Sequence, residues 1–446
     1  MHARRLRQVL ICLANAQTKA HTHHASGPRL SLSSDHVMID EKVQIKADGL
    51  NPGQKVTLFA SIEEANKLYG SCGHYLADEK GTVDTFISDS RGGTFTGVEP
   101  MGLFWSMKSK PGGPDRRLYK KDVMSPYTVS IKVLEGFLNF SDLWGDLDES
   151  CLAACQLFRT YSKPGVKRVV VEKDGLYGTL FFPPGEGPFP AVIDMFGFTN
   201  ESVEFRSALL ASHGLASFVV NYIGYKDLPK RDIDLDYNYF LKAFDFLAAH
   251  PNVDEKAIGG IATCGGAAFL LLIAFKRPMM KCCVTINGVL FPFGTTQEVE
   301  GEIVKGIQLN VKDACIINGK VSMRTVFKPG YEKLILPAWR HGAKMLMIQG
   351  LGDKCSEPAS LDRLRPLIPD EFSEAITMLT YPGAGHLLEP PYSPHVLSNV
   401  NPLLDLHLLW GGEPKLHAKA QEDSWPRILD FFHKNLKTEC NKGEIV

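Results

Sequence analysis

The sequence predicts an all-β domain followed by a mostly parallel α/β sheet with helices on both faces. Short alternating strands separated by turn residues fill positions 29–140, which is typical of a sandwich. After position 166, apolar strands alternate with amphipathic helices, which is typical of a parallel sheet. A turn of small residues around Cys264 also joins a strand to a helix. The 446 residues, of which 44% are hydrophobic and 22% charged, suit a globular protein of two to three domains.

The first domain, residues 29–140, is predicted to be an immunoglobulin-like sandwich. Period-two alternation predicts strands at 43–47, 56–60, 82–86 and 127–133, the last of which is the clearest. Asn51-Pro52-Gly53 and residues 78–81 supply turns between them. Residues 141–165 are polar and acidic, and we interpret them as a linker.

The second domain, residues 166–440, is predicted to hold the α/β sheet. Its expected hairpin spans 169–182 around Gly175. Strands are expected at 191–196, 216–222, 284–288, 344–349 and 376–381, and helices at 205–212, 237–250, 269–275 and 423–436.

The first 28 residues differ in composition from the rest. Arg4, Arg5 and Arg7 precede any acidic residue, the first of which is Asp35, and this composition favours a mitochondrial transit peptide. Two alternatives stay open, a secretory signal that ends near residues 14–16 and an unstructured tail. A cytosolic or peroxisomal location is the alternative address, although the C-terminus is not of the Ser-Lys-Leu type.

Charge and cysteine patterns exclude several classes of partner. The formal net charge of −1 argues against nucleic acid as a partner. The sequence contains no run of about 18 apolar residues, so no membrane-spanning helix is predicted. The ten cysteines form no zinc-type spacing with each other or with histidine, so no metal site is predicted. In a chain of this size they are read as reduced thiols.

The turn at 259–270 is the strongest functional signal. Gly and Ala residues bracket Cys264 between a strand and a helix, which is the layout of a nucleophile elbow. A thiolate is a strong nucleophile, and a helix N-terminus lowers its pKa. The alternative is that Cys264 is a small buried apolar residue.

Two further residues complete a catalytic set. Asp353 follows the strand at 344–349, and His386 follows the strand at 376–381, which gives the nucleophile–acid–histidine order of α/β hydrolases. His386 would act as the base for Cys264, and Asp353 would orient the imidazole. Asp227 and Asp232 are rival acids that precede the nucleophile in the chain.

An oxyanion hole is expected next to Cys264. The backbone N–H of Gly265 supplies one donor. The second donor is expected from the loop after the 191–196 strand, near Phe198.

Long sequence strings resemble one family. These strings are residues 97–107, residues 181–187, residues 381–392 (Tyr-Pro-Gly-Ala-Gly-His-Leu-Leu-Glu-Pro-Pro-Tyr) and residues 410–414. From about residue 30 to about 436 the chain resembles the type I acyl-CoA thioesterases and bile acid-CoA:amino acid N-acyltransferases. The resemblance implies a β-sandwich before an α/β-hydrolase domain, with nucleophile, acid and base at Cys264, Asp353 and His386.

The resemblance implies an enzyme that cleaves fatty acyl-CoA through an acyl-Cys264 intermediate. The thioesterases of this family typically carry Ser at the position of Cys264, and its amino acid N-acyltransferases carry Cys. The acyl group then passes to water or to the amine of glycine or taurine, and bile-acid conjugation proper is one alternative. CoA enters as part of the substrate, so no cofactor is expected. A dienelactone-type hydrolase and a non-catalytic acyl-CoA-binding protein are the remaining alternatives.

Overall fold

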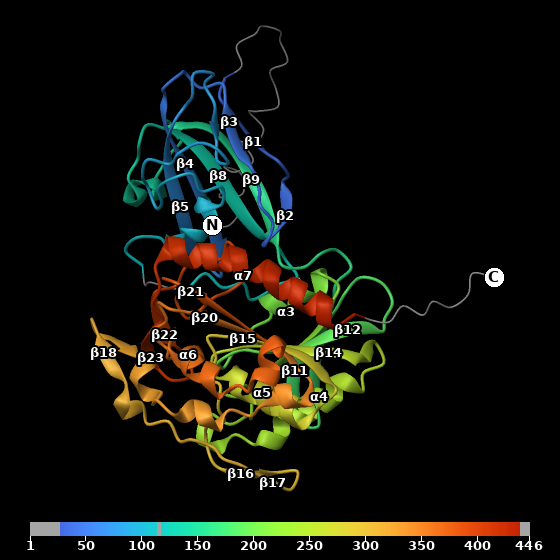
Figure 1. Cartoon of the computed structure of the whole chain (residues 1–446). Helices are drawn as coiled ribbons and strands as arrows, with labels where there is room; N and C mark the ends of the chain where they lie inside the picture. Colours follow the sequence, from blue (N-terminus) through green and yellow to red (C-terminus); the bar gives the residue numbers. More distant parts are fainter. Residues whose placement is uncertain (1–26, 114–116, 438–446) are drawn as a thin grey trace, which may run out of the picture.

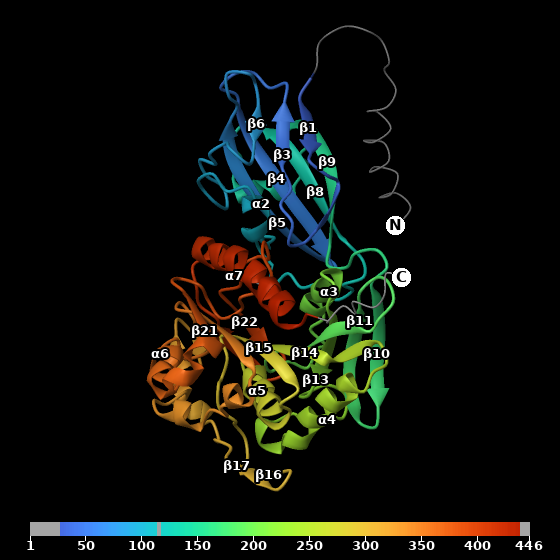
Figure 2. The ribbon, with the colours of Figure 1, turned by 45° about the vertical axis from the view of Figure 1, so that its right-hand side comes forward.

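The computed structural model describes residues 27–113 and 117–437. Figure 1 shows an N-terminal β-rich region above a larger region in which helices surround a central sheet. Helix α7 lies along the boundary between the two regions in both views (Figures 1 and 2). The β-rich region and the α/β region that the sequence predicts are therefore both present in the structure.

Two sheets form the N-terminal region. The smaller sheet has the order β1 (Arg29–Leu32), β3 (Ile45–Asp48) and β6 (Val83–Asp84). The larger sheet has the order β2 (His36–Met38), β9 (Cys151–Thr160), β8 (Tyr127–Glu135), β4 (Lys55–Glu64), β5 (Lys67–Leu76) and β7 (Lys108–Ser109). A short helix, α2 (Gly102–Trp105), packs against this region.

The two sheets share one apolar core. Alternate residues of β3, β4 and β8 point inward, among them Ile45, Leu58 and Ile131, and each is fully buried. This alternation is the period-two pattern from which the strands were predicted.

The predicted linker at 141–165 is wrong. Its first residues belong to a 3-10 helix, η1 (Phe140–Trp144), and residues 151–160 form β9, which pairs antiparallel with β8 and parallel with β2. The polar residues of 141–165 obscured the strand, because the side chains of β9 are buried only at Leu157 and Arg159.

An eight-stranded sheet forms the second region. Its order is β10 (Lys167–Lys173), β11 (Leu176–Phe182), β13 (Ala216–Asn221), β12 (Phe189–Met195), β14 (Val253–Thr263), β15 (Met280–Ile286), β20 (Lys344–Gly350) and β21 (Ile376–Tyr381). The pairs from β13 to β21 are parallel, and β10 and β11 add an antiparallel edge. The predicted hairpin at 169–182 and the predicted strands are confirmed.

Helices cover both faces of this sheet. They are α3 (Phe205–Ser212), α4 (Tyr237–Ala248), α5 (Gly266–Lys276), α6 (Ser360–Leu364) and α7 (Pro414–Asn435). The helix predicted at 423–436 begins nine residues earlier, because Pro414 occupies the first turn, where its missing N–H costs nothing.

Neighbouring residues of each central strand enter different cores. Val284 and Leu346 belong to the core that contains α3 and α7, whereas Cys283 and Met345 belong to the core that contains α4 and α5. Strands buried on both sides read as continuous apolar runs, which explains their clear signal in the sequence.

Two small sheets lie outside the central sheet. A hairpin joins β16 (Gln297–Val299) to β17 (Glu302–Val304), and a four-stranded sheet has the order β18 (Cys315–Ile317), β19 (Lys320–Ser322), β23 (Leu406–Leu409) and β22 (Ser398–Asn401). No helix in residues 27–113 or 117–437 is both long and apolar enough to cross a membrane.

Candidate active site

Cys264 occupies a sharp turn between β14 and α5. Its φ is +58°, a left-handed conformation that a non-glycine residue adopts at a cost of about 1–3 kcal/mol. Backbone hydrogen bonds hold the turn: Cys264 N–H donates to the Ile286 carbonyl at 3.1 Å, and Val289 N–H donates to the Cys264 carbonyl at 3.0 Å. The strained strand–turn–helix geometry is that of a nucleophile elbow.

Small residues around this turn are required by close backbone packing. A Cβ on Gly266 would lie 2.7 Å from the Phe196 carbonyl oxygen. A Cβ on Gly197 would lie 2.8 Å from Cβ of Cys264 and 3.2 Å from its sulfur. The loop after β12 therefore lies directly against the thiol.

Asp353 and His386 form a buried pair. Nδ1 of His386 lies 2.7 Å from Oδ2 of Asp353, and both side chains are at most 1% exposed. The other carboxylate oxygen accepts hydrogen bonds from the backbone N–H groups of Cys355, at 2.6 Å, and Ser356, at 2.9 Å, and the Ser356 hydroxyl also donates to the carboxylate. A carboxylate held by these donors fixes the imidazole with Nδ1–H toward Asp353 and Nε2 away from it.

A second thiol lies beside Cys264. The sulfurs of Cys264 and Cys355 and a ring nitrogen of His386 all lie within 4.8 Å of one another. Both thiols are free. Cys355 lies only two positions after Asp353, yet nothing in the sequence pattern singled it out.

The electrostatics favour a thiolate–imidazolium pair. A hydrogen bond from Cys355 and the charge of His386 hold the pKa of Cys264 well below its usual value, against the effect of burial. Burial lowers the pKa of His386, but the charges of Asp353 and Cys264 outweigh it and raise that pKa to about 10. The hydrogen bond to Cys264 raises the pKa of Cys355, which stays a neutral thiol.

Asn287 connects the loops that carry the acid and the histidine. It follows β15, is fully buried, and has a φ of +47°. Its amide nitrogen donates to the carbonyls of Gly385, at 3.0 Å, and His386, at 2.7 Å, while its oxygen accepts from Gly350 N–H at 2.6 Å. Sequence analysis placed this residue on a strand end and assigned it no role.

His417 holds the same loop from helix α7. Its Nδ1 accepts from Gly385 N–H at 3.0 Å, so its Nε2 carries the proton that it donates to the Leu387 carbonyl, also at 3.0 Å. Burial lowers the pKa of His417 to about 3, and the ring is therefore neutral. His417 thus supports the loop, whereas the ring of His386 lies close to Cys264.

A buried ion pair connects two strands, β14, which leads to Cys264, and β12, which leads to the loop that faces Cys264. Asp194, near the end of β12, pairs with Arg206 of α3, and both side chains are under 5% exposed. Nη1 of Arg206 donates to the Thr263 hydroxyl at 2.7 Å, next to Cys264. The network thus fixes β14 relative to β12.

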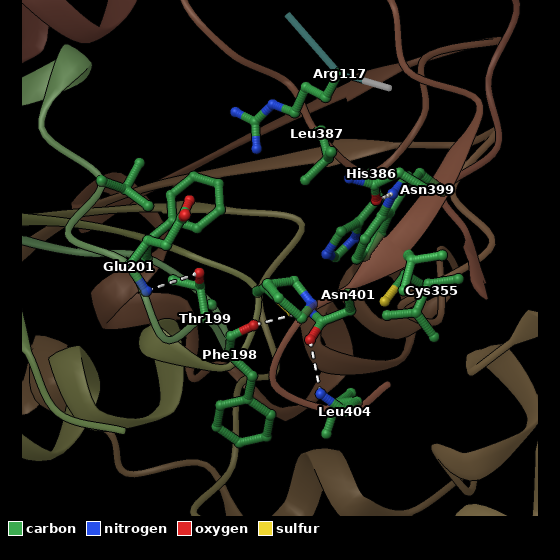
Figure 3. A pocket seen from close by; sticks show the side chains of 18 of the residues that line it. Arg117, Phe198, Thr199, Glu201, Cys355, His386, Leu387, Asn399, Asn401 and Leu404 are labelled. Carbon is green, nitrogen blue, oxygen red and sulfur yellow. Dashed lines mark hydrogen bonds between the residues drawn. The ribbon is translucent and has the colours of Figure 1, made fainter. Parts of the chain in front are cut away.

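A cavity of about 680 Å³ opens over the thiol. Residues of both regions line it, with Phe198, Val289 and Phe293 supplying an apolar wall and Arg117 of the N-terminal region reaching in from another side. Figure 3 shows His386 and Cys355 on one side of this cavity and Phe198 and Glu201 on the other. Such a volume suits a small-molecule ligand with an apolar portion.

The two residues predicted for the oxyanion hole both line this cavity. Gly265 is the N-cap residue of α5, and Phe198 lies in the loop after β12, where its carbonyl accepts from the Asn401 amide at 2.9 Å. The rival acid Asp227 instead forms a hydrogen bond with Tyr177 at the surface.

The fold and the candidate site define an α/β hydrolase. A cysteine lies in a strained strand–helix turn, an acid and a histidine follow it in the chain, and each of the three comes after a strand of a mostly parallel sheet. Two family profiles match the chain: "Acyl-CoA thioester hydrolase/BAAT N-terminal region" over residues 40–173, and "BAAT / Acyl-CoA thioester hydrolase C terminal" over residues 234–438. The chain belongs to this family of acyl-CoA thioester hydrolases and bile acid-CoA:amino acid N-acyltransferases.

Curated relatives cover nearly the whole chain. The human bile acid-CoA:amino acid N-acyltransferase is 38% identical over 92% of this chain and 98% of its own length. The human mitochondrial acyl-coenzyme A thioesterase 2 is 34% identical over 89% of this chain and 82% of its own length. Among solved structures, a dienelactone hydrolase-like promiscuous phosphotriesterase from metagenomic libraries matches with a TM-score of 0.39 and 17% identity, over 61% of this chain and 98% of that one.

Proposed function

We propose that this protein cleaves acyl-CoA thioesters and passes the acyl group from Cys264 to the amine of a small amino acid such as glycine or taurine, with water as the competing acceptor. The observation that carries the proposal is the strained Cys264 turn facing the His386–Asp353 pair at the base of an apolar cavity. The names of the relatives support both acceptors.

The proposed reaction has two steps. The Cys264 thiolate attacks the thioester carbonyl, and CoA leaves as a thiol with the proton of the His386 imidazolium. The acceptor amine then attacks the acyl-Cys264 thioester and gives a proton to His386, and Cys264 leaves as a thiolate. An acyl thioester is a better acyl donor to amines than an ester, which gives a thiol nucleophile a chemical reason in a transferase.

We propose that the N–H groups of Gly265 and Phe198 stabilise the oxyanion of each tetrahedral intermediate. The support is the contact of Gly197 with the thiol, which brings this loop beside the attacking sulfur. Donors aimed at a developing oxyanion contribute roughly 3 kcal/mol each.

The experiment follows CoA release from a long-chain acyl-CoA and a bile-acyl-CoA, with and without glycine or taurine, and identifies products by mass spectrometry. We expect an N-acyl amino acid as the main product, and a fall of at least about 1,000-fold in CoA release for Cys264→Ala. Cys315→Ser is the matched control, because Cys315 lies on β18 and is not among the described residues that line the cavity.

Each result separates the alternatives. Free acid alone, unchanged by amine, would make the protein a thioesterase with a thiol nucleophile. Binding of acyl-CoA with no turnover would make it a non-catalytic binding protein. In Cys264→Ser we expect hydrolysis to gain on amine transfer, because the intermediate becomes an ester.

We propose that the N-terminal domain is an immunoglobulin-like sandwich that extends to about residue 160, and that the catalytic domain spans about 166–440. The support is the pairing of β9 within the N-terminal sheet.

We also propose a mitochondrial address in residues 1–28, which lie almost wholly outside the described residues. Imaging of full-length and 29–446 fluorescent fusions tests this address. A diffuse signal from both would contradict this address.

A further inference from the structure

Cys264, Cys355 and His386 form a cluster of soft ligands that the proposed acyl transfer does not fully use. Acyl transfer needs one thiol and one imidazole, and Cys355 is an additional buried thiol. The three ligand atoms lie within 4.8 Å of one another. We propose that these three residues bind a zinc ion, which ligates the sulfur of Cys264 and thereby inhibits the enzyme reversibly.

The ligand set and its spacing fit zinc. Cys₂His with an open fourth position is a known zinc arrangement, with Zn–S near 2.3 Å and Zn–N near 2.0–2.1 Å. Tetrahedral geometry at those lengths puts the ligand atoms about 3.5–3.8 Å apart, so movements of about 1 Å complete the site. The fourth position faces the cavity, where water completes the coordination.

The imidazole is already oriented as a zinc ligand. Its Nδ1 is committed to Asp353 at 2.7 Å, and this carboxylate–histidine contact is the usual support of a ligating histidine. Within the described residues, Nε2 of His386 has no hydrogen-bond partner of good geometry, although the side chain is only 1% exposed. A buried nitrogen of this kind, aimed at two sulfurs, gains a partner when zinc binds.

The carboxylate of Asp353 links the histidine to the second thiol. It accepts the backbone N–H of Cys355 at 2.6 Å, so the carboxylate that orients His386 also fixes the backbone of Cys355. His386 and Cys355 are therefore both positioned by one residue before the ion binds.

The binding step balances in charge and protons. Zn²⁺ forms Zn–S bonds to the thiolates of Cys264 and Cys355 and a Zn–N bond to the neutral imidazole of His386. Any proton that these three ligand atoms hold beforehand is released to solvent, and the resulting complex is neutral. Metal binding to thiols and imidazoles releases protons in this way.

The test uses the full-length protein and zinc chloride, with binding measured by calorimetry and by protection of Cys264 from iodoacetamide, mapped by peptide mass spectrometry. We expect one zinc per chain, protection of Cys264, and loss of CoA release that a chelator restores. In Cys355→Ser we expect zinc affinity to fall at least about 100-fold, and Cys315→Ser to bind as the wild type does.

Protection does not depend on acyl-CoA turnover, so this test stands apart from the proposed function. Equal zinc affinity in wild type and Cys355→Ser, or zinc bound without protection of Cys264, would overturn the site. Cys355→Ala provides a second variant, and thermal unfolding of each variant without metal confirms that it is folded. A zinc-induced rise in Tm is expected in the wild type and lost in both variants.

Discussion

At the scale of single residues, the site depends on charge held out of water. His386 is buried, and burial alone would lower its pKa, yet the adjacent charges raise that pKa to about 10. The imidazolium therefore persists across neutral pH and keeps Cys264 as a thiolate. The stabilising contribution of the charged His386 is fully present below the unfolded histidine value near 6.5 and is lost as pH rises through about 10.

Asp353→Asn tests this electrostatic origin. We expect kcat/KM to fall by roughly 10³–10⁴-fold, because the imidazole loses both its charge partner and its orientation. We also expect the basic limb of the pH profile to move down from near pH 10, and the pKa of Cys264, read from the pH dependence of its alkylation rate, to rise.

The matched control for this change is Asp227→Asn, which makes the same substitution at an exposed carboxylate. Its pH profile and alkylation rate should match the wild type. A basic limb that stays in place in Asp353→Asn would show that Asp353 does not set the charge of the imidazole.

At the scale of elements, the site depends on strand ends that are locked together. Asn287 links the end of β20 to the histidine loop, and His417 of α7 holds that loop from the other side. The Asp194–Arg206 pair performs the same function between β12 and β14. These residues supply rigidity to loops that otherwise have no sheet or helix to hold them.

Arg206→Met tests the buried pair. Removal of the guanidinium leaves the Asp194 carboxylate buried without its charge partner, which is expected to cost about 3–5 kcal/mol of unfolding free energy. Urea unfolding with an unchanged m-value measures this cost. We expect the double variant Asp194→Asn, Arg206→Met to recover part of it.

Arg231→Met is the control for this second prediction. Arg231 pairs with Asp234, but these side chains are 66% and 44% exposed, so its loss should cost less than about 1 kcal/mol. Similar costs for Arg206→Met and Arg231→Met would contradict a structural role for the buried pair.

At the scale of the whole molecule, the two regions share one apolar core. Val37 and Ile131 of the N-terminal region belong to the same cluster as Leu209 of α3 and Phe432 of α7. Arg117 reaches from the N-terminal region into the cavity and pairs with Glu389. The N-terminal region thus contributes to the candidate site, since its residues form part of the cavity wall.

This continuity predicts a single cooperative unfolding transition. Asp40, between β2 and β3, accepts hydrogen bonds from His213 at 2.7 Å and from the Trp425 indole at 2.8 Å. Asp40→Ala should lower Tm while calorimetry, far-UV circular dichroism and tryptophan fluorescence still report one coincident transition. Asp48→Ala, at the exposed face of β3, is the control.

Separate transitions for the two regions, with only one displaced in Asp40→Ala, would contradict a shared core. The exposed pair of Asp48 with Lys46 is expected to contribute under about 1 kcal/mol, so the control should unfold close to the wild type.

Local patterns along the chain were enough to predict the strands and helices of the parallel sheet, the order of Cys264, Asp353 and His386, and the family. These follow from local properties, because a doubly buried strand is continuously apolar and a tight turn requires small residues. β9 was missed, because most of its side chains are only partly buried and form no such pattern. The early start of α7 was missed for the same reason, since its first turn is polar.

Which distant side chains come into contact depends on the folded chain. Cys355 lies 91 residues after Cys264, and His417 lies 31 after His386, so no spacing rule pairs them. Parallel strands bring their carboxyl ends to one edge of the sheet, and the loops there are fixed by buried hydrogen bonds such as those of Asn287. The lowered pKa of Cys264 follows from these contacts, because neighbouring charges and burial set a pKa, and both are properties of the folded chain.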